Sequence, residues 1–169
     1  VLSRGLGDVY KRQYLIILLV IFSCEKNNNS PNIIFILTDD LGYGDLSSYG
    51  SETIKTTNID KLAEDGVKLT SYYAAQPVCS ASRAAILTGA YPNRIGIYNA
   101  FGPTSNSGIN HDEYTLAEML KDNGYKTGIF GKWHLGSIKE FFPTKHGFDE
   151  FYGILYSNDT VSYTHLTLP

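Results

Sequence analysis

A helix signal and a strand signal follow one another in Thr115-Leu-Ala-Glu-Met-Leu-Lys-Asp-Asn-Gly-Tyr-Lys-Thr-Gly-Ile-Phe130. Thr115 and Glu118 form a capping box, and the apolar residues that follow share one helix face. Asn123-Gly124 ends this helix, and Tyr125 to Phe130 has the composition of a strand. The segment therefore predicts a helix that leads directly into a strand.

The same alternation continues toward the N-terminus. Asn32-Ile-Ile-Phe-Ile-Leu37 is a continuous apolar run, typical of a strand buried on both faces of a parallel sheet. Asn58 is the expected N-cap of a helix that runs to Asp65, and Val67 to Tyr73 is expected to form a second strand. A short helix is predicted over residues 79–87. Strands that alternate with helices predict an α/β fold with a mainly parallel sheet flanked by helices.

Composition and charge limit the classes of function. The chain has 169 residues, of which 43% are hydrophobic and 18% charged, enough for one domain with a core. Its net charge is −3, and it has no basic stripe. These features argue against nucleic acid as the main partner.

Two cysteines, Cys24 and Cys79, permit one disulfide, but each has a separate explanation. Residues 14–24 form an apolar run that is too short to span a bilayer and is typical of a signal peptide. The run ends in Ile21-Phe-Ser-Cys24, which resembles a bacterial lipobox. We therefore expect export to the bacterial periplasm or outer surface, with lipidation of Cys24 as the only membrane anchor. The alternative for residues 14–24 is a buried strand.

The two ends of the chain differ from the rest. Residues 25–30 are a polar tether that needs no fold. Residues 1–13 and 161–169 share no pattern with their neighbours and resemble translated adapter read-through, so we expect both to be non-native. Residues 31–160 remain as the folded part, and contiguous coding sequence in the underlying DNA would contradict this division.

Chemically capable side chains follow two of the predicted strands. Asp39 and Asp40 follow the first, and Lys132 and His134 follow the strand over residues 125–130. Ligands of open α/β sheets gather at the carboxyl ends of strands. The adjacent carboxylates suit a hard cation, with a solvated turn as the alternative. Lys132 and His134 are expected to face one side and to suit an oxyanion and proton transfer, with an ordinary surface pair as the alternative.

A third group lies in Cys79-Ser-Ala-Ser-Arg83, at the first turn of the helix predicted over residues 79–87. Backbone N–H groups and the helix dipole favour an anion there, and Arg83 lies one turn on from Cys79. This arrangement predicts an activated nucleophile that faces an anionic substrate. The alternative is a small buried thiol.

Four blocks, in this order, resemble the type I sulfatases, which depend on formylglycine and include the arylsulfatases. The blocks are Leu37-Thr-Asp-Asp-Leu-Gly-Tyr-Gly-Asp45, Cys79-Ser-Ala-Ser-Arg83, Gly131-Lys-Trp-His-Leu-Gly136 and His146-Gly-Phe-Asp-Glu-Phe-Tyr-Gly153. The resemblance covers residues 31–159 and implies an alkaline-phosphatase-like fold, truncated here at the C-terminus. It also implies hydrolysis of sulfate esters, whether aryl sulfates or sulfated carbohydrates. Residues 31–160 would then be the N-terminal part of the catalytic domain.

The resemblance also implies a role for each site residue. A maturation enzyme would oxidise Cys79 to formylglycine, whose hydrate attacks sulfur. Arg83 would hold this hydrate, and His134 would assist the proton removal that releases sulfate. Lys132 and Ser157 would bind the substrate. The metal, Ca²⁺ in preference to Mg²⁺, would be held by Asp39, Asp40 and the modified Cys79.

The remaining expectations concern the fourth block and the extent of the chain. His146 is expected to be a packing or hydrogen-bonded histidine. The family's further metal ligands and leaving-group residues lie downstream of the four blocks, so we expect the chain alone to be inactive. Position 81 is Ala where many members have Pro, which leaves the identity of the maturation enzyme open. The alternatives are a phosphonate or phosphate-ester hydrolase of the same superfamily and an anchored glycan-binding relic with unmodified Cys79.

Overall fold

The computed structural model describes residues 30–157 and 164–167. The chain divides into two units, Val1–Thr38 and Asp39–Pro169, which are considered separately. The predicted signal segment, with Cys24, lies outside the described residues. Within the described ranges, no helix combines the length and the apolar character needed to cross a membrane.

The described part of the first unit, residues 30–38, is exposed and carries no strand. Ile34 and Ile36 are 85% and 76% exposed. The strand predicted over residues 32–37 is therefore wrong for this structure. An apolar, β-branched run favours extended backbone, but a strand also needs a neighbour for its N–H and C=O groups. None of the described strands pairs with this segment.

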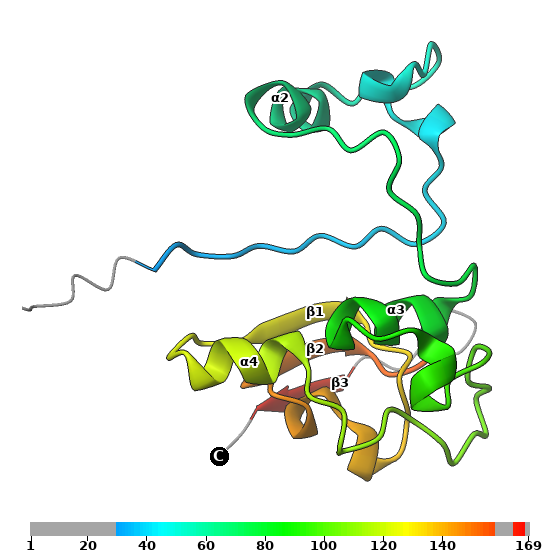
Figure 1. Ribbon diagram of the computed structural model, residues 1–169, viewed down its shortest axis with the longest axis vertical. Coiled ribbons are helices and arrows are strands. Elements are labelled where there is room, and N and C mark those ends of the chain that lie inside the picture. The colour runs from blue at the N-terminus through cyan, green and yellow to red at the C-terminus, as the bar shows by residue number, and fades with distance from the viewer. Residues whose placement is uncertain (1–29, 158–163, 168–169) are drawn as a thin grey trace, which may run out of the picture. The chain divides into compact units, whose positions relative to one another are not determined.

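The described residues of the second unit form a three-stranded sheet and three α-helices (Figure 1). The strands are β1 (Gly128–Lys132), β2 (Glu150–Ile154) and β3 (Thr164–Thr167), and the α-helices are α2 (Thr57–Asp65), α3 (Cys79–Thr88) and α4 (Leu116–Asp122). Five short 3-10 helices are η1 (Tyr43–Asp45), η2 (Ser47–Tyr49), η3 (Pro92–Ile95), η4 (Lys139–Phe141) and η5 (Pro143–Lys145). The sheet order is β1-β2-β3, with β1 and β2 parallel and β2 and β3 antiparallel. This architecture confirms the predicted α/β class.

β3 falls within residues 161–169, which the sequence marks as foreign to the fold. Its backbone pairs with β2, with Phe151 opposite Leu166. Pairing of this kind shows that the segment can extend a sheet edge. The natural or foreign origin of residues 161–169 stays a prediction.

Two helix ends follow the sequence signals closely. The Thr115 hydroxyl accepts from the Glu118 backbone N–H at 3.2 Å, and the Glu118 carboxylate accepts from the Thr115 N–H at 2.7 Å. This capping box starts α4 as predicted. α3 ends at Gly89, whose φ of +67° is the left-handed conformation that glycine adopts without strain.

Two predicted element starts and one predicted strand differ from the structure. α2 begins at Thr57 instead of after Asn58, because the Thr56 carbonyl accepts from the Asp60 N–H at 2.9 Å and starts the helix earlier. β1 begins at Gly128 instead of Tyr125, because the N–H of Thr127 is bound by Asp149 at 3.0 Å. Residues 67–73 are exposed and form no strand. The absence of a strand over residues 67–73 has the same cause as over residues 32–37. The residue types favour an extended backbone, but no neighbouring strand pairs with it in the described structure.

The core joins the sheet to helices α3 and α4. Small residues of the two helices pack with Trp133, Phe151 and other apolar side chains; the buried members are Ala81, Ala84, Ile97, Ile109, Ala117, Trp133, Leu135, Phe148 and Phe151. The parallel ladder between β1 and β2 continues beyond Lys132, since Trp133 N–H donates to Ile154 O and His134 N–H to Leu155 O. The sheet therefore positions the residues that follow β1.

His146 is fully buried, as expected for a packing residue, but neither ring nitrogen has a hydrogen-bond partner among the described residues. Its ring stacks on His111 with centroids 5.1 Å apart and lies 6.0 Å from the Trp133 ring. Burial, followed by the electrostatic effect of His111, lowers the pKa of His146 to about 4, although Glu118 opposes the shift. The ring is therefore neutral in the folded chain at neutral pH.

This burial makes folding sensitive to acid. Between pH 6.5 and about 4 the unfolded chain binds a proton at His146 that the folded chain refuses, so stability falls as the pH is lowered through this range. We expect the part of the loss that is due to His146 to approach about 3 kcal/mol at pH 4, so the stability of His146→Phe should fall less steeply, as measured by urea unfolding. The pKa of His134 is also lowered by burial, and this histidine contributes to the pH dependence of both proteins. The pKa of Asp149 is lowered from 3.8 to about 2, so its stabilising effect is lost mainly as the pH falls between these values, and equally in both proteins. Equal slopes for the two proteins would contradict the prediction.

Candidate active site

Asp39 lies between two cations from distant parts of the chain. Lys132 Nζ is 2.9 Å from Asp39 Oδ2, and Arg83 Nη2 is 3.2 Å from Asp39 Oδ1. Hydrogen bonding from Lys132 is the main cause that lowers the pKa of Asp39, and Arg83 adds to it, while partial burial opposes the shift. Asp39 is therefore a carboxylate at neutral pH.

The same two cations connect this carboxylate to Cys79. Lys132 Nζ lies 3.6 Å from Cys79 Sγ, and Arg83 Nη1 donates a hydrogen bond to the Lys132 carbonyl. Cys79 is a free, half-buried thiol at the start of α3. Both cationic side chains are only 11% exposed. The structure thus brings residues of the first three sequence blocks together at one point.

His134 is nearly buried beside this cluster, at 4% exposure. Its Nε2 lies 2.9 Å from the Phe101 carbonyl oxygen, and its ring meets Tyr156 edge-on at 4.9 Å. Burial is the main cause that lowers the pKa of His134; Lys132 and Arg83 lower it further, whereas Asp39 and the hydrogen bond to Phe101 raise it. A neutral imidazole near two cations suits the role of proton acceptor.

The predicted alignment of Lys132 and His134 on one side assumed extended backbone. His134 instead has a φ of +57°, in the left-handed region that costs a non-glycine residue energy. Its ring is therefore directed by its contacts with Phe101 and Tyr156, and not by strand alternation. The positive charge of Lys132 still lowers the pKa of His134, although the two side chains are not aligned by strand alternation.

The predicted metal ligands fit a hard cation in their chemistry. Asp39 and Asp40 offer carboxylate oxygens, and Asp40 takes a left-handed backbone with φ of +56° directly after Asp39. Ca²⁺ needs six to eight oxygens. Among residues 30–157 and 164–167, no group of three or more His, Cys, Asp or Glu could hold a metal ion. The two aspartates thus supply the right atoms but only part of a coordination sphere.

The sequence predicts one further site residue, Ser157, and misses another, Phe101. Ser157 is half-buried, three residues after the end of β2, and its substrate role stays a prediction. Phe101 is a site neighbour that the sequence analysis missed, because it acts through its backbone carbonyl. A carbonyl contact leaves no residue-type signal in a sequence.

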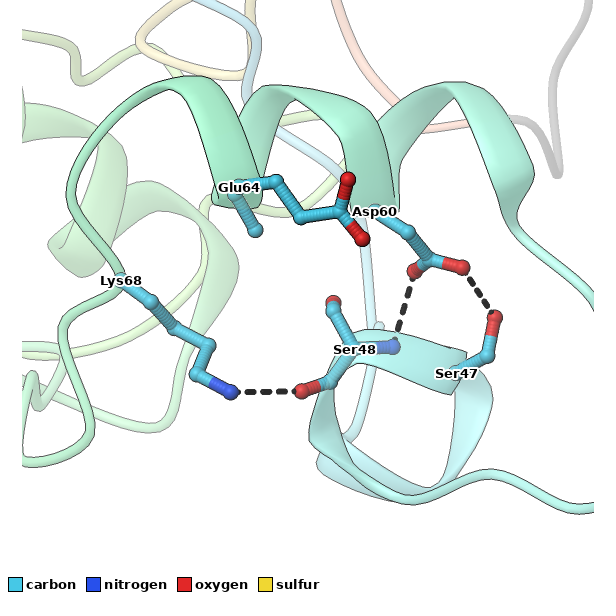
Figure 2. A pocket seen from close by; sticks show the side chains of 6 residues that line it. Ser47, Ser48, Asp60, Glu64 and Lys68 are labelled. Atoms are coloured by element: carbon cyan, nitrogen blue, oxygen red, sulfur yellow. Dashed lines mark hydrogen bonds between the residues drawn. The ribbon is translucent and has the colours of Figure 1, made fainter.

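A cavity of about 310 Å³ lies elsewhere, between η2 and α2. Its lining is Ser47, Ser48, Asp60, Ala63, Glu64 and Lys68. Figure 2 shows Asp60 accepting from Ser47 Oγ and Ser48 N–H, while Lys68 donates to the Ser48 carbonyl. These hydrogen bonds hold η2 and Lys68 beside α2. The lining includes none of the predicted site residues, so the cavity is separate from the Asp39 cluster.

The fold and the site together define an α/β protein with a thiol, a carboxylate and two cations gathered at the end of a parallel strand. A family model named Sulfatase matches residues 31–167. The chain belongs to the sulfatase family. Its α/β class is that of the alkaline-phosphatase-like fold.

Known relatives agree with this assignment. The chain is 50% identical over 140 residues to bovine arylsulfatase A, with 81% of this chain and 28% of that protein covered. It is 47% identical over 156 residues to human steryl-sulfatase, with 83% and 27% covered. A crystal structure of Ps i-CgsB in complex with k-i-k-neocarrahexaose is similar with a TM-score of 0.73 and 45% identity, covering 75% of this chain and 28% of that one. The chain thus spans about a quarter of the length of these relatives.

Arg83 should matter for stability as well as for the site. Arg83→Lys loses the planar fork that binds the Lys132 carbonyl and the Asp39 carboxylate at once. We expect a loss of about 2 kcal/mol in the free energy of unfolding, measured by urea denaturation of the chain. Arg94→Lys, at an exposed arginine in η3, is the matched control with little change expected. Equal stability of the two variants would contradict the structural role of Arg83.

Proposed function

We propose that this chain is the N-terminal part of a catalytic domain that hydrolyses sulfate esters with a formylglycine formed from Cys79. The observation that carries the proposal is the position of Lys132, whose Nζ lies 2.9 Å from Asp39 and 3.6 Å from Cys79 Sγ. This contact joins three sequence blocks at one anion-binding point. Family membership supplies the reaction class.

Each residue then has a task at a stated atom. Lys132 Nζ binds an oxygen of the sulfate group and spreads its negative charge. Arg83 holds Asp39 and the end of β1 in place through its two nitrogens. A divalent cation held by Asp39, Asp40 and the modified Cys79 would supply Lewis-acid stabilisation of the sulfate oxygens.

The chemistry at Cys79 follows from an aldehyde hydrate. One hydroxyl oxygen bonds to sulfur while the substrate's alcohol oxygen leaves with a proton. His134 then accepts a proton from the second hydroxyl. The bond between the formylglycine carbon and the bridging sulfate oxygen breaks, which releases sulfate and restores the aldehyde. The near-buried, neutral imidazole of His134 supports this role.

The substrate class we propose is a sulfated carbohydrate or an aryl sulfate, bound with help from Ser157. Arylsulfatase A and the structure of Ps i-CgsB in complex with k-i-k-neocarrahexaose are among the similar proteins. We further propose Ca²⁺ as the metal, because the carboxylates of Asp39 and Asp40 are hard ligands. The phosphonate or phosphate-ester hydrolase and the glycan-binding relic are not favoured by the comparisons.

Location and maturation complete the proposal. The apolar run at residues 14–24 with Cys24 supports export and a lipid anchor at the bacterial periplasm or outer surface. A formylglycine-generating enzyme is the maturation partner, acting on Cys79-Ser-Ala-Ser-Arg83. The chain alone is expected to be inactive, because it spans about 28% of bovine arylsulfatase A.

Mass spectrometry of the Cys79 peptide tests the central step. In protein made by a host with formylglycine-generating activity, we expect the peptide to lack the mass of H₂S and to gain one oxygen. Ordinary thiol oxidation adds oxygen without loss of sulfur, so the two outcomes differ. An unmodified thiol in native-host protein would favour the relic, and faster turnover of phosphonate than sulfate esters would favour the other hydrolase.

A further inference from the structure

We infer that Ser80 is a positioning residue for His134, acting through both backbone groups of Phe101. Ser80 Oγ accepts a hydrogen bond from the Phe101 N–H at 3.0 Å. The carbonyl of the same residue lies 2.9 Å from His134 Nε2. One residue of the loop after η3 therefore links the start of α3 to the histidine that follows β1.

The link lies in the interior of the unit. Ser80 is fully buried and His134 is 4% exposed, so water does not compete freely for these hydrogen bonds. Phe101 also packs its side chain against the core formed by Ala81, Ala84 and Trp133. Phe101 is thus held by two backbone hydrogen bonds and by the packing of its side chain.

The contact with Phe101 selects which ring nitrogen of His134 carries hydrogen. A carbonyl oxygen accepts hydrogen bonds and cannot donate them, so Nε2 must be the protonated nitrogen whatever the charge of the ring. In the neutral ring Nδ1 then keeps its lone pair. Nδ1 is buried and has no partner among the described residues. His134 is therefore held as a proton acceptor at Nδ1.

Ser80 is the residue that maintains this choice. Without its hydroxyl, the Phe101 N–H would be left in the interior without an acceptor, and the loop would gain by turning that N–H toward another partner. The N–H and the carbonyl of Phe101 belong to successive peptide planes that share its Cα, so a shift of this residue would displace the carbonyl from Nε2 and weaken the preference for the Nε2–H form. Ser80 thus controls His134 without touching it, from a position next to Cys79.

Nitrogen NMR of the chain with ¹⁵N-labelled histidine tests the inference. The correlations between ring nitrogens and ring hydrogens distinguish Nε2–H from Nδ1–H. At neutral pH we expect a pure Nε2–H pattern for His134 in the wild type and a mixture of both forms in Ser80→Ala. Hydrogen exchange of the Phe101 amide should become about tenfold faster in Ser80→Ala, as expected for loss of one hydrogen bond.

Matched variants separate positioning from general damage. Ser80→Thr keeps the hydroxyl and should restore the wild-type pattern, whereas Ser80→Val has the shape of threonine without the hydroxyl and should not. Ser105→Ala removes a hydrogen bond to Ser107 in the same loop and should leave His134 unchanged. The valine and threonine pair also decides the matter if Ser80→Ala does not fold.

Two results would overturn the inference. One is an Nδ1–H ring in the wild type, and the other is an unchanged ring pattern and amide exchange in both Ser80→Ala and Ser80→Val. The inference rests on the proposed function only for the catalytic use of His134. Because the NMR readout needs no turnover, failure of sulfate ester hydrolysis and failure of this link are separate outcomes.

Discussion

We expect Cys79→Ala to reduce the proposed sulfate ester hydrolysis by at least about 10³-fold in kcat. The variant removes the atom that becomes the nucleophile but leaves the ion pairs among Asp39, Arg83 and Lys132 in place. Turnover of an aryl sulfate is measured with a protein that carries this chain together with the rest of a sulfatase domain. Binding of inorganic sulfate should persist, because Lys132 remains.

Cys79→Ser is the sharper companion variant. A serine hydroxyl can accept the sulfate group once, but it has no second hydroxyl through which to expel it. We expect a protein that gains one sulfate per chain, detected by intact mass, and then stops. Sustained turnover by either variant would show that position 79 does not supply the nucleophile.

Gly153→Ala should have the largest effect on folding. Gly153 is buried in β2 opposite Gly131 of β1, and an added Cβ would overlap the backbone oxygen, carbon and nitrogen of Gly131. Backbone atoms in a parallel ladder cannot move aside as a flexible side chain can. We expect a loss of about 3 kcal/mol or more in the free energy of unfolding, measured by urea denaturation.

Gly44→Ala is the matched control. Nothing lies within 4 Å of an added Cβ at Gly44, and its φ is not in the left-handed region. Its stability should stay within about 0.5 kcal/mol of the wild type. A Gly153→Ala variant as stable as Gly44→Ala would mean that the two strands are further apart than the structure places them.

The fold could be predicted from the sequence where the signal is local. The capping box of Thr115 and Glu118 marks the start of α4, and the left-handed Gly89 marks the end of α3. Each signal acts within one helical turn, so the sequence alone identifies it. The runs at residues 32–37 and 67–73 predict extended backbone but not a neighbour. Strand formation depends on hydrogen-bond partners far along the chain, which a short pattern does not contain.

The site divides in the same way. The residue types of Cys79, Arg83 and Lys132 already indicate anion chemistry, and that of Asp39 indicates a hard cation. In the structure these four side chains form one contact cluster, while their roles stay predictions. The role of Phe101 could not be predicted, because its N–H and carbonyl are shared by every non-proline residue. The left-handed backbone of His134 was equally hidden, since it arises from tertiary contacts.

The two hydrogen bonds of the Arg83 guanidinium, to the Lys132 carbonyl and to the Asp39 carboxylate, have a consequence for protein engineering. One guanidinium holds the backbone at the end of β1 and the side chain of Asp39, so a substitution there alters folding and chemistry together. In a library randomised at position 83, we therefore expect many members to be destabilised, whatever their effect on specificity. Directed evolution of substrate range should therefore leave this arginine untouched and vary exposed loop positions instead.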